Sequence, residues 1–391
     1  MPNDQASKPM YEQIFETLRD RIREGKYAVG DRVPSEKELG DEFQVSRITS
    51  KKALELLAMD GYIVRQPGRG SFVADFGRSH TPLQGSAAIP SKQRRTGGRR
   101  LIGLIMTDFG DAYGNGLVYG MEQASRDHDS YLVLRRSFGI PANEEEAIKG
   151  LLELGVDGLI ILPAQGEYFN SEILKLVIGQ FPFVLVDRHL KGLSAGSIST
   201  DNVTGAVKGT NYLFELGHRH IAFLTPPPMD TTAIEDRIEG FIQAHAERGV
   251  VVDRDIWIQD ITSTLPTAYV EENKRKDIEK IKAHLVKHPH ITALFATEYN
   301  IALLASEAAK ELGLAVPDDL SIICFDSPYR NGVQPYTHLR QNEEEMGRLA
   351  FEHVLRLREG EQLPNRVLLD AELIVGSSTG PVKPRVSERG Y

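Results

Sequence analysis

The chain has 391 residues, 41% of them hydrophobic, and a formal net charge of −9. That length exceeds what one hydrophobic core usually serves, so two or three domains are expected. No apolar run is long enough for a membrane-spanning helix, and the start of the chain lacks the charged-then-apolar pattern of a signal peptide, which predicts a cytoplasmic protein. The single cysteine, Cys324, excludes an internal disulfide and a cysteine-based metal site.

The charge is distributed unevenly along the chain. Residues 1–76 hold 12 Lys and Arg against 13 Asp and Glu, residues 77–100 hold six cations and no acid, and residues 101–391 hold 28 cations against 42 acids. The first segment is therefore near neutral, and it would have to bind a polyanion through well-placed side chains rather than through bulk charge. The acidity lies in the last segment.

Three helices are predicted before residue 60. In residues 10–27, Ile14, Leu18 and Ile22 recur at intervals of four and form the apolar face of an amphipathic helix. The second helix follows Ser35, an N-cap residue, and the third follows Ser46. The third helix is expected to bury Ala53, Leu54, Leu57 and Ala58 and to expose Arg47, Thr49, Ser50 and Lys51.

A two-stranded hairpin is predicted after the third helix. Residues 62–64 and 71–73 are apolar or β-branched, and the sequence Arg65-Gln66-Pro67-Gly68-Arg69-Gly70 lies between them. Glycines let a backbone approach a phosphate closely, and arginines add charge-assisted contacts or enter a minor groove. A cationic face on a helix pair is also compatible with a solvated surface, but the hairpin that follows it favours DNA binding.

Residues 10–73 resemble the winged helix-turn-helix of GntR-type bacterial transcription regulators, through PSEKELGDEFQVSR, MDGYI and GRGSFV. The resemblance implies a double-stranded DNA operator as partner. One departure is Ser50-Lys51, where the family usually has an apolar residue and then Arg. Lys51 is therefore expected to contact a phosphate rather than to recognise a guanine base. The DNA contacts that the resemblance implies are Glu36, Lys37, Ser46, Arg47, Thr49, Lys51, Gly68, Arg69 and Gly70.

Residues 77–100 predict a flexible linker, because they combine few large apolar residues with turn-forming residues and six cations. Two interpretations of its basic end stay open. It is either a solubilising tether or a segment whose arginines contact DNA phosphates. The arginines concerned are Arg94, Arg95, Arg99 and Arg100.

From residue 101 short apolar runs alternate with helical stretches. The runs are LIGLIM, YLVL, DGLIIL, FVLVD, HIAFL, ITALFA and LSIICFD. Strands this apolar are expected to be buried on both faces of parallel sheets. Seven such units exceed one small doubly wound sheet, so we expect an α/β fold with two lobes.

Polar residues follow these strands, where ligands of open α/β sheets bind. Hydroxyl groups, carboxylates and arginines at one edge suit a sugar or polyol, whose hydroxyls both donate and accept. The candidate ligand-binding residues at these strand ends are Asp108, Tyr113, Asp187, Arg188, Arg237, Thr297, Glu298, Asp326 and Gln341.

Residues 101–380 resemble the effector domain of LacI/GalR repressors and periplasmic sugar-binding proteins, through VDRH, STDNVTGAVKGTNYLFELGHRHIAFL and VPDDLSIICFD. Joined to a GntR-type head, and with RIEGFIQAHAER, the chain resembles the arabinose-repressor subfamily. The resemblance implies a two-lobed periplasmic-binding-protein-like fold and ligand roles for Arg237, Asp326 and Gln341, and also for Asp187, Arg188 and Asp201. Thr297-Glu298 stands where many relatives have Asn-Asp, so the resemblance does not identify the sugar.

The expected organisation is a winged helix-turn-helix at 1–76, a linker at 77–100, an effector and dimerisation domain at 101–380, and a tail at 381–391. The function expected is a homodimeric repressor of carbohydrate-utilisation genes, released from DNA when a small sugar closes the lobes about strands near residues 337–340. Rival interpretations are a sugar-binding protein or a carbohydrate-active enzyme without DNA regulation, but GxGxxG, GxxxxGK[ST], GxSxG and HExxH motifs are absent. No cofactor, metal or membrane partner is expected.

Overall fold

The computed structural model describes residues 10–59, 62–66, 70–74, 99–164, 170–190, 193, 195–228, 231–328 and 335–383. The chain forms two compact units, and each is described by itself. One contains the residues up to 91, and the other contains residues 92–191 and 195–391. None of the helices in these described ranges has the length and apolar character needed to cross a membrane.

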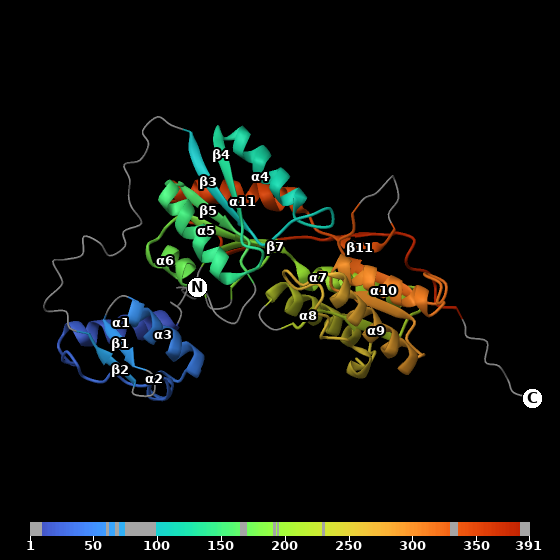
Figure 1. Cartoon of the computed structure of the whole chain (residues 1–391), viewed down its shortest axis with the longest axis horizontal. Coiled ribbons are helices and arrows are strands. Elements are labelled where there is room, and N and C mark those ends of the chain that lie inside the picture. The colour runs from blue at the N-terminus through green and yellow to red at the C-terminus, as the bar shows by residue number, and fades with distance from the viewer. Residues whose placement is uncertain are drawn as a thin grey trace, which may run out of the picture. The chain divides into compact units, whose positions relative to one another are not determined.

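The N-terminal unit is a three-helix domain with a two-stranded wing (Figure 1). Ser35 forms a capping box with Glu38 at the start of the second helix, and Gln44 ends that helix in a left-handed conformation. Leu39, Leu54 and Leu57 are fully buried between the helices, which confirms the prediction for Leu54 and Leu57. The elements are α1 (Met10–Arg23), α2 (Glu36–Phe43), α3 (Arg47–Met59), β1 (Ile63–Gln66) and β2 (Gly70–Val73), and the two strands pair antiparallel.

One prediction for α3 is wrong. Ser50 was expected on the exposed face, but its side chain is fully buried. Leu54 and Leu57 lie four and seven residues further along the helix, so Ser50 shares their buried face. Of the two hydroxyls predicted on the exposed face of α3, those of Thr49 and Ser50, only the Thr49 hydroxyl can contact DNA.

The second unit has two lobes, each built on a twisted sheet (Figure 1). In the N-terminal lobe six parallel strands lie in the order β12-β7-β6-β5-β3-β4. Helices α4 and α11 pack side by side on one face of this sheet, and α5 contacts α6. The elements are β3 (Arg100–Met106), α4 (Asn115–Asp127), β4 (Ser130–Arg136), α5 (Pro141–Leu154), β5 (Gly158–Ile161), α6 (Ser171–Ile178), β6 (Phe183–Val186), β7 (Gly196–Thr200), α11 (Glu343–Arg358) and β12 (Arg366–Leu369).

The C-terminal lobe has five strands in the order β13-β11-β10-β9-β8, and only the outermost pair, β13 with β11, is antiparallel. A cluster of aromatic rings around Phe223, Phe241 and Phe295 fills its core. The elements are α7 (Asn202–Glu215), β8 (Ile221–Leu224), α8 (Thr232–Glu247), η1 (Arg254–Ile256), α9 (Glu271–Lys287), β9 (Ala293–Ala296), α10 (Tyr299–Glu311), β10 (Ser321–Phe325), β11 (Thr337–Arg340) and β13 (Glu372–Ile374).

The chain passes between the lobes three times, at residues 200–202, 340–343 and 369–372. The second passage follows β11, whose bounds are those predicted for a crossover strand. Its continuation, α11, packs so closely on α4 that a Cβ atom added at Gly120 would lie 2.0 Å from the carbonyl oxygen of Glu344. The passage at residues 340–343, the hinge, therefore leads directly into the tightly packed pair of helices α4 and α11.

The two-lobed α/β fold with a winged helix-turn-helix is confirmed, but the strands are not all buried. Strand β4, predicted from YLVL as a buried strand, lies at the edge of its sheet, and its Tyr131 is 49% exposed. Strands β7, β12 and β13 and helices α7, α9 and α11 were not predicted from the sequence. The domain boundaries at 76, 100 and 380 stay predictions.

Candidate functional site

Helices α2 and α3 carry the cations expected to contact DNA. Lys37 on α2 and Arg47 on α3 are exposed, and Thr49 on α3 is partly exposed. Ser46 caps α3, because its Oγ accepts a hydrogen bond from the backbone N–H of Thr49 at 3.2 Å and lies 2.9 Å from the Thr49 hydroxyl. Both hydroxyls therefore have a helix-capping role beside the predicted DNA role, while Lys51 lies 4.0 Å from Glu55.

The base of the wing is tied to both helices by Arg65. Its guanidinium lies 2.6 Å from Glu36 at the start of α2 and 3.3 Å from Glu55 on α3. Glu36, a predicted DNA contact, is thus an ion-pair partner of the wing. Gly70 has φ +114°, which favours glycine at the start of β2, whereas Gly68 and Arg69 lie outside the described residues.

The two described linker arginines contact the N-terminal lobe. Arg99 lies 2.7 Å from Asp129 and donates a hydrogen bond to the Tyr131 hydroxyl at 2.6 Å. Arg100 lies 3.1 Å from Glu359. These contacts favour an anchoring role for this end of the linker, and Arg94 and Arg95 lie outside the described residues.

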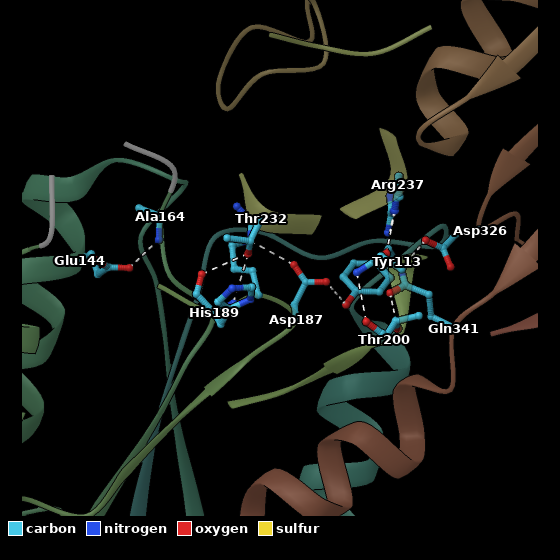
Figure 2. Close-up of polar contacts among 12 residues, drawn as sticks. Tyr113, Glu144, Ala164, Asp187, His189, Thr200, Thr232, Arg237, Asp326 and Gln341 are labelled. Atoms are coloured by element: carbon cyan, nitrogen blue, oxygen red, sulfur yellow. Dashed lines mark hydrogen bonds and ion pairs between the residues drawn. The ribbon is translucent and has the colours of Figure 1, made fainter. Parts of the chain in front are cut away.

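A cavity of about 150 Å³ lies between the two lobes. Tyr113, Asp187 and Arg188 reach it from the N-terminal lobe, and Arg237 and Asp326 reach it from the C-terminal lobe (Figure 2). The lining residues are Ala112, Tyr113, Asp187, Arg188, Pro226, Thr231, Ala233, Ile234, Arg237, Glu298, Tyr299, Asn300, Asp326 and Gln341.

Arg237 is the central cation of this cavity. Its Nε donates to Asn202 Oδ1 at 2.8 Å, and its Nη1 donates to the carbonyl oxygen of Thr297 at 2.5 Å. The guanidinium lies 3.8 Å from the centre of the Phe325 ring, which fixes its plane. Burial lowers the pKa of Arg237, and the nearby carboxylates of Asp326 and Asp187 oppose that effect.

Asp326 is joined to the other lobe by a buried relay (Figure 2). The Thr200 hydroxyl, at the end of β7, donates to Gln341 Oε1 at 2.6 Å, and Gln341 Nε2 donates to Asp326 Oδ2 at 2.8 Å. Burial raises the pKa of Asp326 to about 7, against the opposing effect of Arg237. A carboxyl group with this pKa can either donate or accept a hydrogen bond near neutral pH.

Asp187 holds its two neighbours in place. The Tyr113 hydroxyl donates to Asp187 Oδ1 at 2.5 Å, and Arg188 Nε lies 3.2 Å from Asp187 Oδ2. Burial raises the pKa of Tyr113 well above its usual value, and Asp187 adds to the shift, so the phenol is a hydrogen-bond donor. Arg188 Nη1 is buried and has no protein partner among the described residues.

Thr297 and Glu298 follow β9 and differ in their positions. Thr297 is fully buried and offers its carbonyl oxygen to Arg237. Glu298 lines the cavity; it stands at the N-cap of α10, yet its side chain makes no capping hydrogen bond. Burial raises the pKa of Glu298, and its Oε1 has no hydrogen-bond partner in the described part of the chain.

Three candidate ligand residues, Thr297, Asp108 and Asp201, do not line this cavity. Asp108 is exposed, and its Oδ1 accepts from the backbone N–H of Phe109 and pairs with Arg136 at 3.1 Å. Asp201 caps α7, because its two carboxylate oxygens accept from the backbone N–H and the hydroxyl of Thr204. The sequence indicates the right strand ends, but it does not show which way each side chain turns.

Three contributors to the site were not identified from the sequence. Asn202 positions Arg237, Thr200 begins the relay, and Glu343 accepts from the backbone N–H groups of Gly114 and Gly116 at 2.7 and 3.1 Å. Each lies at a passage between the lobes, which only the sheet order reveals. The sequence could have indicated Thr200 and Asn202, because they lie on either side of Asp201, which was predicted to bind the ligand.

A larger cavity of about 710 Å³ lies beside the hinge, and Asp326 and Gln341 line it too. Most of its other charged residues are acidic, including Asp111, Glu344 and Glu372. Within the described ranges, no group of three or more His, Cys, Asp or Glu residues is arranged to hold a metal ion. The smaller cavity, with its balanced donors and acceptors, is the better candidate for a small ligand.

Two family models match the chain. Residues 10–73 match the model of bacterial regulatory proteins of the gntR family. Residues 210–379 match the model of a periplasmic binding protein-like domain. The first match covers the winged domain, and the second runs from α7 through β13.

Similar proteins are transcription regulators. The arabinose metabolism transcriptional repressor of Geobacillus stearothermophilus is 28% identical over 95% of this chain and 98% of its own length. The repressor of the same name from Halalkalibacterium halodurans is 26% identical over 97% of this chain and 98% of its own length.

Solved structures share the fold of the second unit. The transcription regulator CcpA of Lactococcus lactis matches with a TM-score of 0.62 and 20% identity, over 72% of this chain and 99% of its own. A LacI family transcriptional regulator from Enterococcus faecium with bound ribose matches with a TM-score of 0.60 and 23% identity, over 73% of this chain and 100% of its own. The chain is therefore a transcription regulator in which a DNA-binding domain of the gntR family precedes a periplasmic-binding-protein-like domain.

Proposed function

We propose that this chain is a repressor of sugar-utilisation genes whose interlobe cavity binds a monosaccharide, with L-arabinose or another pentose as the first candidate. The winged domain binds the operator, and the sugar weakens that binding. Two relatives are named as arabinose metabolism repressors, and a regulator of the same fold holds ribose. The protein is proposed to act in the cytoplasm, where the operator is.

The single observation that carries the sugar proposal is the set of polar groups around the smaller cavity. Arg188 and Arg237 donate hydrogen bonds, Asp187 accepts them, and Asp326 can do either. Paired sugar hydroxyls need both kinds of partner. The cavity, at about 150 Å³, is smaller than the roughly 300–1,000 Å³ of sites for drug-sized ligands, which favours a ligand of monosaccharide size.

The charges around the cavity favour a neutral sugar over a sugar phosphate. Its lining includes three carboxyl groups, Asp187, Glu298 and Asp326, against the two guanidinium groups of Arg188 and Arg237. Arg188 pairs with Asp187, and two nitrogens of Arg237 are already hydrogen-bonded. A phosphate dianion would lie beside three carboxyl groups, whereas a neutral sugar can accept a hydrogen bond from Arg188 Nη1, unpartnered within the described ranges, without that repulsion.

A homodimer completes the proposal. One winged domain makes few base contacts, and two half-sites about one helical turn apart require a two-fold protein. Coupling of about 1–3 kcal/mol between sugar and operator, a typical allosteric value, would change operator affinity roughly 5–150-fold. That range is sufficient for a genetic switch.

The test is an electrophoretic mobility-shift titration of the full-length protein on its own upstream DNA, with and without L-arabinose, D-ribose and D-galactose. One sugar is expected to release the DNA. Arg47→Ala should weaken DNA binding and leave calorimetric sugar binding intact, whereas Asp326→Ala should keep the protein on DNA in the presence of the sugar. DNA binding unaffected by any sugar, or conversion of a sugar into a product, would contradict the proposal.

A further inference from the structure

Helix α8 of the C-terminal lobe contacts the N-terminal lobe through two residues on one face. The Thr232 hydroxyl accepts a hydrogen bond from the backbone N–H of His189 at 3.3 Å and donates one to the carbonyl oxygen of His189 at 3.1 Å (Figure 2). One turn further along, Asp236 lies 3.0 Å from Arg366 of β12. Residues four apart share a helix face, so both contacts belong to one interlobe strip.

The same helix faces the ligand cavity with other residues. Ala233, Ile234 and Arg237 line the cavity, whereas Thr232 and Asp236 are not among its lining residues. Helix α8 therefore contacts the ligand space and the opposite lobe at the same time. A change at Thr232 can alter the contact between the lobes without removing an atom from the cavity wall.

The two contacts of the strip differ in strength. Thr232 is 7% exposed, so little water competes for its hydrogen bonds with the His189 backbone. Arg366 is 42% exposed, and ion pairs at such exposure contribute little. Thr231, the residue at the N-cap of α8, makes no side-chain capping bond, and the Thr232 hydroxyl is bonded to the other lobe instead of to its own helix.

We propose that Thr232 is a positioning residue, a latch that holds the two lobes closed through the His189 backbone without touching the ligand. Both partners of this contact belong to the protein, so the contact favours the closed arrangement whether or not the sugar is bound. The sugar then meets a cavity that is already assembled, and less of its binding free energy goes into closing the lobes. The effect on sugar affinity rests on the proposed function, but the effect on closure does not.

The first test measures closure in full-length protein without any sugar. Spin labels at Leu154→Cys and Val286→Cys report the distance between the lobes by double electron–electron resonance; both positions are more than half exposed, and the native Cys324 is fully buried. Thr232→Val keeps the side-chain volume and removes the hydroxyl, so its distance distribution should shift to longer values. Thr232→Ser restores the hydroxyl and should restore the parental distribution.

The matched control is Thr210→Val. The Thr210 hydroxyl is also buried, and it donates a hydrogen bond to the carbonyl oxygen of Ala206 at 2.8 Å, but both residues lie inside α7 within one lobe. This variant should keep the parental distribution. An unchanged distribution in Thr232→Val, or an equal shift in Thr210→Val, would overturn the latch.

The second test measures L-arabinose binding by calorimetry. Loss of a hydrogen bond of ordinary strength predicts affinity about two- to tenfold weaker for Thr232→Val, and affinity within about twofold of the parent for Thr232→Ser and Thr210→Val. Equal affinity in Thr232→Val and the parent would overturn the latch. If neither the parent nor any variant binds L-arabinose, the proposal that L-arabinose is the effector is rejected. The distance measurement still tests the latch.

Discussion

Two carboxylates of the cavity occupy an unusual backbone conformation. Asp187 has φ +72° and Asp326 has φ +57°, and each directly follows a buried strand, β6 in one lobe and β10 in the other. Residues other than glycine rarely adopt positive φ, and such strain gathers at functional sites. The bend turns both side chains toward the space between the lobes.

The pKa of Asp326 predicts a pH-dependent stability. The pKa of this carboxyl is raised from 3.8 to about 7 in the folded protein, so its stabilising contribution is complete below about pH 4 and is lost as the pH rises through 7. Asp326→Asn stays neutral and avoids this loss. The melting temperature of the variant, measured from pH 5 to 8 without ligand, should therefore rise relative to that of the parent as the pH increases.

If the difference in melting temperature between Asp326→Asn and the parent stays constant from pH 5 to 8, Asp326 is already charged at pH 5. The linked free energy is on the order of 1–4 kcal/mol, which is large enough to detect by calorimetry.

The sequence predicts which strand ends carry functional groups, but not the direction of each side chain. Arg237, Asp187 and Asp326 were predicted and line the cavity. Asp201 was predicted, yet the neighbouring Asn202 contacts Arg237 instead, because Asp201 occupies the N-cap position of α7. Adjacent residues point in different directions, and no periodicity in the sequence distinguishes between them.

The contact between α4 and α11 depends on small residues. A Cβ atom at Gly120 would lie 2.0 Å from the backbone oxygen of Glu344, and one at Gly347 would lie 2.2 Å from the backbone oxygen of Leu117. Both obstacles are backbone atoms, which cannot rotate away as a side chain would. The two helices can approach this closely only because both positions are glycine.

Gly120→Ala should therefore destabilise the second unit by about 1–3 kcal/mol, the usual cost of overpacking. The matched control is Gly150→Ala in α5, where an added Cβ atom meets nothing within 4 Å. Alanine at that helical position should be neutral or stabilising by up to about 1 kcal/mol. Urea unfolding of both variants checks the difference, and equal stability of the two would contradict the close packing of α4 and α11.

At the level of elements, the failure to predict α11 and the wrong prediction for β4 have different causes. Helix α11 has Met346, Ala350 and Val354 at intervals of four, so its amphipathic pattern was present in the sequence. Strand β4 could not be recognised as an edge strand, because its YLVL run has the composition of a central strand. Its exposure follows from strand order, which composition does not encode.

At the scale of the whole molecule, the two units differ in net charge. The winged domain is close to neutral, whereas residues 101–391 hold most of the negative charge. The number of apolar runs predicted two lobes, and the two sheets confirm them. The return of α11 and β12 to the N-terminal lobe was not predictable, because β12 pairs with β7, which lies more than 100 residues earlier in the chain.

Cleavage of the linker should release a fragment of residues 101–391 that is still dimeric. The reason is that the effector unit, and not the small winged domain, is proposed to hold the two half-site readers together. Size-exclusion chromatography with light scattering gives the mass directly. A monomeric fragment would place the dimer contact in the winged domain.

The return of the chain to its first lobe has a consequence for biosynthesis. Met346, Phe351 and Val354 of α11 fill the apolar core beneath β3, β5 and β6, and β12 supplies the last strand of the same sheet. A nascent chain therefore leaves this lobe unfinished until residue 369 has emerged from the ribosome. The first lobe can complete its fold only after β12 has been synthesised, by which time the winged domain has had time to fold.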